Sequence, residues 1–169
     1  MTENEFRTHY EQFRVPLFRC GYRLTGSAEV AEDLVHDCFV SLFRGGFDAQ
    51  RGSLKTYLYG AVRNLARKYH RDSGREESDD DIDRAVDRAR HGDALDALIS
   101  RETSATVQRA VEALPLAQRE VLVLFEYEDL ALGEISKIVG ADIGAVKSRL
   151  YRAREGLRKS LGLLKEAGR

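Results

Sequence analysis

The feature that most constrains this chain is a pair of amphipathic helices separated by a short turn, within residues 130–158. The apolar residues of the first helix recur at steps of three and four: Leu132, Ile135, Ile138 and Val139. This spacing predicts a helix over residues 131–139, which Gly140 can end because glycine adopts the left-handed conformation without a Cβ penalty. Asp142 can then accept hydrogen bonds from the amides that open the next helix. The pattern predicts a helix-turn-helix.

The second helix of this pair has one apolar side and one basic side. Its expected inner stripe is Ile143, Val146, Leu150, Ala153, Leu157 and Leu161. Residues 143–159 contain six basic side chains and one acidic side chain, a local net charge of +5. Positive charge suits DNA phosphates, and the small residues Gly144 and Ala145 keep the start of the helix thin enough for the major groove. The alternative is a helical hairpin with a solvated basic face.

The net charge of −1 would by itself argue against a nucleic-acid-binding protein, so the charge has to be followed along the chain. Residues 1–71 hold eleven basic and eight acidic side chains (+3), and residues 101–169 hold twelve and ten (+2). Residues 72–100 hold four and ten (−6). Two basic segments therefore flank an acidic one, which reads as an extended, flexible linker because its charges repel one another.

Several classes of function find no support in the sequence. Cys20 and Cys38 fall on apolar stripes and are expected to be reduced core thiols, and the four histidines lack metal-ligand spacing, so neither a metal site nor a cofactor is predicted. No catalytic arrangement of a nucleophile, a base and an acid appears. The longest apolar run, residues 121–125, is too short to cross a membrane, and the first residues are acidic, so we expect a cytoplasmic protein without membrane insertion.

The first 71 residues predict three helices. Residues 5–24 form one apolar pattern that Pro16 either kinks or divides, and Ser27 can cap a second helix that ends at Gly45. The inner stripe of this second helix is Ala31, Leu34, Val35, Cys38, Phe39, Leu42 and Phe43. Its other face carries Glu32, Asp33, His36, Asp37 and Val40, which on pattern alone is a solvated surface.

The third helix, from Ser53, is the most basic of the chain. Residues 51–71 include six basic side chains and no acid. Beside its apolar stripe we predict a surface made of Lys55, Tyr59, Arg63, Asn64, Arg67, Lys68 and Arg71. Positive charge with aromatic rings suits single-stranded DNA, because charges follow the phosphates while rings stack on exposed bases. A plain basic face is the alternative.

The remaining segments are also helical in pattern. Residues 103–114 predict an amphipathic helix, and Pro115 begins another that runs to about residue 127 and supplies the core for the helix-turn-helix. No strand alternation appears. The fold class predicted is all-α, with two small helical domains, 1–71 and 101–169, joined by the acidic linker 72–100.

Four segments of this sequence resemble the extracytoplasmic-function group of bacterial sigma factors: residues 31–39 (AEDLVHDCF), 57–66 (YLYGAVRNLA), 114–121 (LPLAQREV) and 144–154 (GAVKSRLYRAR). The chain departs from that family at His36 and Asp37, where glutamine and glutamate are more usual. Tyr57 stands where tryptophan is common, and Ala131 stands where a serine or similar residue caps the helix.

The resemblance implies a role for each face. Residues 1–71 would be sigma region 2, which binds the RNA polymerase core enzyme and opens the minus-ten element, and residues 101–169 would be region 4, which recognises the minus-thirty-five element. The polymerase-binding residues would be Asp33, His36, Asp37 and Val40. The minus-ten residues would be the basic surface of the third helix. The minus-thirty-five residues would be Gly144, Ala145, Lys147, Ser148, Arg149, Tyr151 and Arg152.

The implied function is promoter-specific initiation of transcription, regulated by an anti-sigma factor. Two other functions stay open on the sequence. One is a sigma-like adaptor that binds an anti-sigma factor without recognising a promoter, and the other is a dimeric helix-turn-helix repressor. Intact basic residues on both DNA faces disfavour the adaptor, and the acidic face of the second helix disfavours the repressor.

Overall fold

The structure is a computed structural model that describes residues 1–74 and 100–167. The described part is helical, with no β-strand, as the all-α prediction required. Its first three helices are α1 (Glu3–Thr25), α2 (Ala28–Phe43) and α3 (Leu54–Asp72). The remaining elements are α5 (Ser100–Glu112), α6 (Leu116–Leu122), a π-helical turn η3 (Val123–Tyr127), α7 (Leu132–Val139) and α8 (Ile143–Ala167). Most of the expected linker, 72–100, lies outside the described residues, and so does its last part, 95–99, where the apolar residues also allow a helix.

Local sequence signals set the ends of the first three helices. The hydroxyl of Thr2 accepts a hydrogen bond from the amide of Glu5, whose carboxylate accepts one from the amide of Thr2, so a capping box opens α1. Ser27 and Ser53 are the N-cap residues of α2 and α3, and each hydroxyl accepts a hydrogen bond from the amide three residues later. The sequence predicted this cap for Ser27. Pro16 lies inside α1, which continues through it as a single helix.

The predicted helix-turn-helix is confirmed in α7 and α8. Gly140 has a φ of 70° and its amide donates to the carbonyl of Ser136, which closes α7. The carboxylate of Asp142 accepts a 2.7 Å hydrogen bond from the amide of Ala145 and opens α8. Ala131 cannot cap α7 with its side chain, but its own amide donates to Glu134 at 3.0 Å. Ala131, where the sequence departs from the family pattern, therefore keeps one of the two hydrogen bonds of a capping box.

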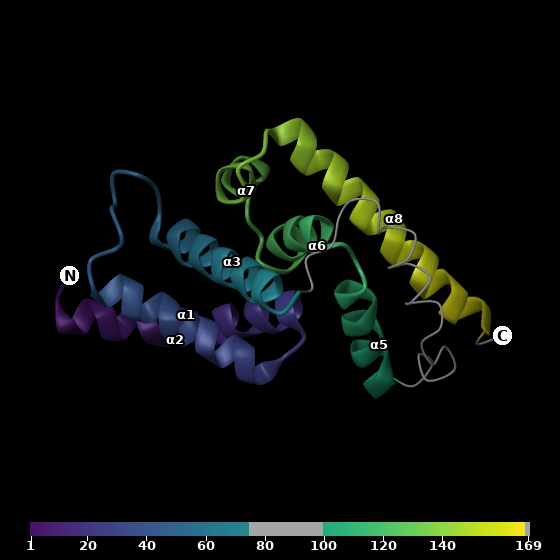
Figure 1. The fold of residues 1–169 in the computed structure, drawn as a ribbon, viewed down its shortest axis with the longest axis horizontal. Helices are drawn as coiled ribbons and strands as arrows, with labels where there is room; N and C mark the ends of the chain where they lie inside the picture. The colour runs from purple at the N-terminus through teal and green to yellow at the C-terminus, as the bar shows by residue number, and fades with distance from the viewer. Residues whose placement is uncertain (75–99, 168–169) are drawn as a thin grey trace.

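The helices form two groups that pack against each other (Figure 1). In the first group, α1, α2 and α3 all contact one another. In the second, α8 packs along α5, α6 and α7. The groups meet where α1 contacts α5, α6 and η3 and where α3 contacts α7, and the buried apolar residues of both groups form one continuous cluster.

Two details of the sequence prediction were wrong. Ile143 and Phe43, expected on inner stripes, are 45% and 76% exposed. Each is the end residue of its helix, beyond the elements that cover the rest of the stripe, although the ring of Phe43 still contacts Phe6 edge-on. The helix expected over residues 116–127 does run to Tyr127, but its last five residues, Val123–Tyr127, are π-helical. There the amide of Glu128 donates to the carbonyl of Val123, five residues earlier.

Candidate nucleic-acid interfaces and docking face

The outer face of α8 is exposed and basic, as the sequence predicted. Val146, Leu150 and Ala153 are buried, which turns Lys147, Ser148, Tyr151 and Arg152 to the outside. Gly144 is exposed and Ala145 is half-buried at the start of the helix. The structure thus brings six of the seven predicted minus-thirty-five residues to one surface. Arg149 is half-buried, and its charge contributes to lowering the pKa of Arg63 on α3, so it lies toward the other group of helices.

Two later arginines of α8 have acidic partners. Arg154 donates to the carboxylate of Glu126 at 2.9 Å, and Arg158 lies 3.0 Å from Glu155. Within residues 1–74 and 100–167, neither Lys147 nor Arg152 has such a partner. Lys147 and Arg152 therefore keep unpaired positive charge within the first three turns of α8, at the end that can enter a major groove.

The basic surface predicted on α3 is divided by the fold. Asn64, Lys68 and Arg71 are exposed, and Lys55 is half-buried. Tyr59 and Arg63 are buried, at 3% and 9% exposed, and the side chain of Arg67 is 36% exposed. The three more buried residues all face the second group of helices, so only part of the predicted minus-ten surface is accessible in this conformation.

Two glutamates of the second group cover these residues. The hydroxyl of Tyr59 donates a 2.7 Å hydrogen bond to Glu128, which lies directly after the π-helical turn. Arg67 Nε donates at 2.7 Å to Glu120 Oε1 on α6, and Arg63 Nε lies 3.1 Å from the same oxygen. Glu120 is 1% exposed, so its charge is compensated mainly by these two guanidinium groups.

Burial governs the ionisation of this cluster. Removal from water lowers the pKa of Arg63, an effect that Glu120 opposes. Burial, with the hydrogen bond to Glu128, raises the pKa of Tyr59, so its hydroxyl stays protonated and remains a donor. Burial also raises the pKa of Glu128, although the hydrogen bond from Tyr59 and the charge of Arg23 act against it.

Sequence reasoning missed Glu120, Glu128 and Arg23. One signal was available for Glu120: it lies within a helix predicted to build a core, where a carboxylate requires a buried cation as partner. The sequence does not say that this cation comes from a helix more than 50 residues earlier.

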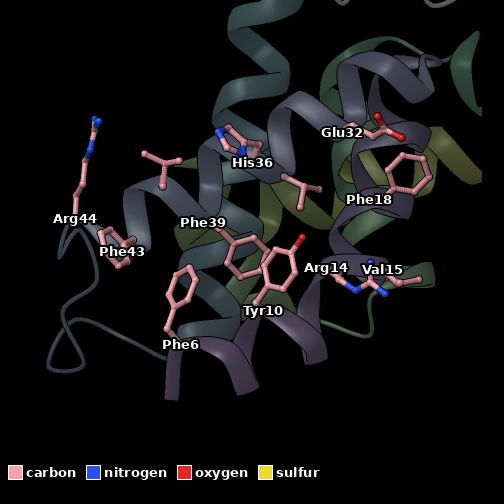
Figure 2. Close-up of a pocket in the computed structure, with 12 residues that line it drawn as sticks. Phe6, Tyr10, Arg14, Val15, Phe18, Glu32, His36, Phe39, Phe43 and Arg44 are labelled. Carbon is pink, nitrogen blue, oxygen red and sulfur yellow. The ribbon is translucent and has the colours of Figure 1, made fainter. Parts of the chain in front are cut away.

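The predicted polymerase-binding face of α2 is accessible. Asp33, His36 and Asp37 are exposed and Val40 is half-buried. His36 and Val40 also line a groove of about 850 Å³ between α1 and α2 (Figure 2). The other residues that line it are Phe6, Tyr10, Arg14, Val15, Phe18, Glu32, Val35, Phe39, Phe43 and Arg44.

The floor of this groove is aromatic. Figure 2 shows Phe6, Tyr10, Phe39 and Phe43 together, and their rings meet edge-on with centroids 4.9 to 6.1 Å apart. The sequence placed Phe39 and Phe43 on an inner stripe and Phe6 and Tyr10 within the apolar pattern of residues 5–24. Helical periodicity does not show that two packed helices leave a groove open between them. The predicted face, made of three polar side chains and Val40, is thus continuous with an apolar groove.

The described residues contain no group of three histidine, cysteine, aspartate or glutamate side chains placed to hold a metal ion. Cys20 and Cys38 are free and buried, as predicted, and burial raises the pKa of Cys38 to about 12. No described helix combines the length and the apolar character needed to cross a membrane.

These features define a class of protein: an all-α chain in which a group of three helices is followed by a second group that contains a helix-turn-helix. Comparisons with known proteins identify that class further. The family model for sigma-70 region 2 matches residues 9–76, and the model for sigma-70 region 4 matches residues 104–157.

Individual relatives agree. The chain is 31% identical to the ECF RNA polymerase sigma-E factor of Escherichia coli strain K12, over 74% of this chain and 70% of that one. It is 32% identical to the ECF sigma factor SigE of Mycolicibacterium smegmatis over 86% of this chain, but it spans only 57% of the length of that relative. The chain belongs to the extracytoplasmic-function group of sigma factors.

A solved structure has the same fold. It is the sigma factor RpoE of Bartonella quintana, crystallised in complex with the anti-sigma factor NepR. The likeness has a TM-score of 0.69 and covers 94% of this chain and 97% of that one, at 23% sequence identity.

Proposed function

We propose that this chain directs RNA polymerase to a set of promoters by dividing the work between its two groups of helices. Residues 1–71 bind the core enzyme and the opened minus-ten element, residues 72–100 link the halves, and residues 101–169 bind the minus-thirty-five element as duplex. The chemistry of transcription belongs to the polymerase, so the chain acts in the cytoplasm as a binding protein rather than as an enzyme.

The observation that carries this proposal is the unpaired basic face at the start of α8. Lys147 and Arg152 project outward while Val146, Leu150 and Ala153 anchor the helix to the core. A helix fixed on one side and donor-rich on the other is what major-groove recognition requires. An adaptor that only occupied an anti-sigma factor would not need this face.

The accessible groove on α1 and α2 supports a protein partner for the first half. Aromatic and aliphatic side chains surrounded by charged ones are typical of protein interfaces. We assign Asp33, His36, Asp37 and Val40, with the adjoining groove, to the core enzyme. An anti-sigma factor, the kind of partner found with the Bartonella protein, is the second partner that we propose.

Run-off transcription with purified core polymerase and the DNA upstream of the chain's own gene tests the proposal. A transcript that requires the chain supports a sigma factor. Repression by a dimer, or capture of an anti-sigma protein without any transcript, would support the repressor or the adaptor instead.

A further inference from the structure

The first residue of α8 is an apolar side chain that the helix-turn-helix does not bury. Ile143 is 45% exposed, although Val146 and Leu150, on the same apolar stripe, are 0% and 5% exposed. The start of α8 lies at the edge of the molecule, next to the end of α7 (Figure 1). A single exposed isoleucine is common on protein surfaces, so its surroundings decide whether it has a role.

Ile143 begins a row of exposed side chains along α8. Residues four apart lie on one side of a helix, so Ile143, Lys147 and Tyr151 follow one another in this row. All three are exposed, and Tyr151 is 66% exposed. Lys147 and Tyr151 belong to the predicted minus-thirty-five surface, whereas periodicity had placed Ile143 on the inner stripe. The structure therefore extends the outer surface of α8 by one turn, with an apolar residue at its start.

The backbone that carries Ile143 is held on both sides. Before it, Gly140 closes α7 in the left-handed conformation. After it, the amide of Ala145 donates to the carboxylate of Asp142 at 2.7 Å, and the amide of Val146 donates to the carbonyl of Asp142 at 3.0 Å. Isoleucine is branched at Cβ, which restricts χ1, so it loses little rotamer freedom when a partner packs against it. The position thus offers a stiff apolar group on a fixed backbone.

The chemistry of the major groove limits what such a group can recognise. Isoleucine has neither a donor nor an acceptor for a polar base edge. The edges of guanine, adenine and cytosine present polar groups there, whereas thymine adds a C5-methyl group beside its O4. Packing an isoleucine against a polar edge leaves that edge without a hydrogen bond, while packing it against a methyl group removes apolar surface from water. Thymine is therefore the base that an isoleucine favours.

We propose that Ile143 recognises the C5-methyl group of a thymine in the minus-thirty-five element. This inference rests on the proposed function of α8 as the helix that binds this element as duplex. Lys147 lies about 6 Å further along the helix axis, so the thymine should lie within about two base pairs of the base that Lys147 contacts. Polar contacts from Lys147 and Arg152 and an apolar contact from Ile143 together select the sequence.

The test removes one methyl group from the DNA at a time. A fluorescein-labelled duplex carries the minus-thirty-five region of the promoter that the run-off assay identifies, and each thymine in turn is replaced by deoxyuridine. Fluorescence anisotropy gives the dissociation constant of the full chain for wild type and for Ile143→Ala. For wild type, one replacement should weaken binding by about threefold to fivefold, the effect of one buried methyl group. Ile143→Ala should bind the thymine and deoxyuridine forms of that duplex equally.

Three comparisons separate methyl recognition from other effects. Loss of a methyl group also changes the deformability of the duplex, but that effect would persist in Ile143→Ala. A general disturbance at the start of α8 would weaken binding to both forms by the same factor. Since Ile143 carries no charge, Ile143→Ala should keep the salt dependence of wild type, unlike the loss of a phosphate contact.

Two further variants act as controls. Ile143→Val keeps the branched Cβ and should retain part of the preference for thymine. Tyr22→Ala removes a side chain on α1 that is 37% exposed and should behave as wild type.

Two results would overturn the proposal: a wild type that is indifferent to every thymine methyl group, or an Ile143→Ala variant that keeps the full preference at the sensitive thymine. Either result in a wild type that binds the duplex and directs transcription refutes only the role of Ile143. A wild type that neither binds the duplex nor directs a transcript would refute the sigma-factor proposal itself.

Discussion

The guanidinium of Arg67 on α3 donates a 2.7 Å hydrogen bond to the carboxylate of Glu120 on α6, 53 residues further along the chain. The same carboxylate oxygen lies 3.1 Å from Arg63. One buried acid from the second half thereby ties together two cations of the first. This relationship couples the stability of the folded chain to residues that we also assign to DNA.

Arg67→Ala should therefore destabilise the free protein. It removes one of the two cations that compensate a buried carboxylate, which we expect to lower the free energy of unfolding by about 1 to 3 kcal/mol. Urea unfolding followed by circular dichroism measures this. Lys68→Ala, at the exposed neighbouring position, is the matched control and should change stability by less than about 0.5 kcal/mol. Equal effects at the two positions would mean that the ion pair contributes nothing in solution.

Charge reversal on α2 should abolish binding to core polymerase. Asp33→Lys with Asp37→Lys changes two exposed residues of the proposed docking face, so helicity should be unchanged while co-purification with core enzyme is lost. Asp48→Lys, an exposed acid in the loop after α2, is the control and should leave binding intact. Undiminished co-purification of the double variant would remove α2 from the polymerase interface.

Base recognition should depend on Lys147 and Arg152. Alanine at either should cost about 1 to 3 kcal/mol on the correct minus-thirty-five element and much less on a mutated one, because a base-contacting residue discriminates between sequences. Arg158→Ala is the control, since Arg158 lies about three turns after Lys147 and pairs with Glu155. Binding of the full chain to single-base promoter variants measures these effects. A change of base preference confined to Arg158→Ala would show that α8 docks differently.

Glu128 should give the folded chain a specific pH dependence. Burial raises its pKa in the folded protein above the ordinary value of 4.5, so the folded state holds this proton more tightly than the unfolded state does. The stabilisation is complete below pH 4.5 and is lost as pH rises through the folded pKa. The groups that act on Glu128 are Tyr59, kept protonated by its own raised pKa, the cations Arg23 and Lys55, and the acid Asp129, which raises the pKa further.

The measurement is the free energy of unfolding of wild type and of Glu128→Gln at several pH values from 4.5 to 7.5. Since glutamine does not titrate, wild type should gain stability relative to the variant as pH falls. Glu126→Gln, the same substitution at an exposed position, provides the comparison. A trend of the opposite sign would mean that the ion pair with Arg23 outweighs burial.

The sequence by itself determined the local structure and the outer face of α8. Gly140 and Asp142 fixed the turn, Ser27 fixed the start of α2, and the apolar spacing of Val146 and Leu150 left Lys147 and Arg152 outside. These features follow from backbone conformation, capping and periodicity within a few residues, so they need no knowledge of the partner element.

The tertiary structure decided which faces are covered. Periodicity predicted that Tyr59, Arg63 and Arg67 share a surface, but whether that surface meets water, DNA or another helix depends on contacts made 53 and 69 residues away. Two other features also depend on the packing of separate elements: the groove between α1 and α2, and the burial of Glu120. Neither can be seen in the apolar pattern of one helix. The sequence of a helix specifies which side it must bury. What lies against its other side depends on contacts with residues far away in the sequence.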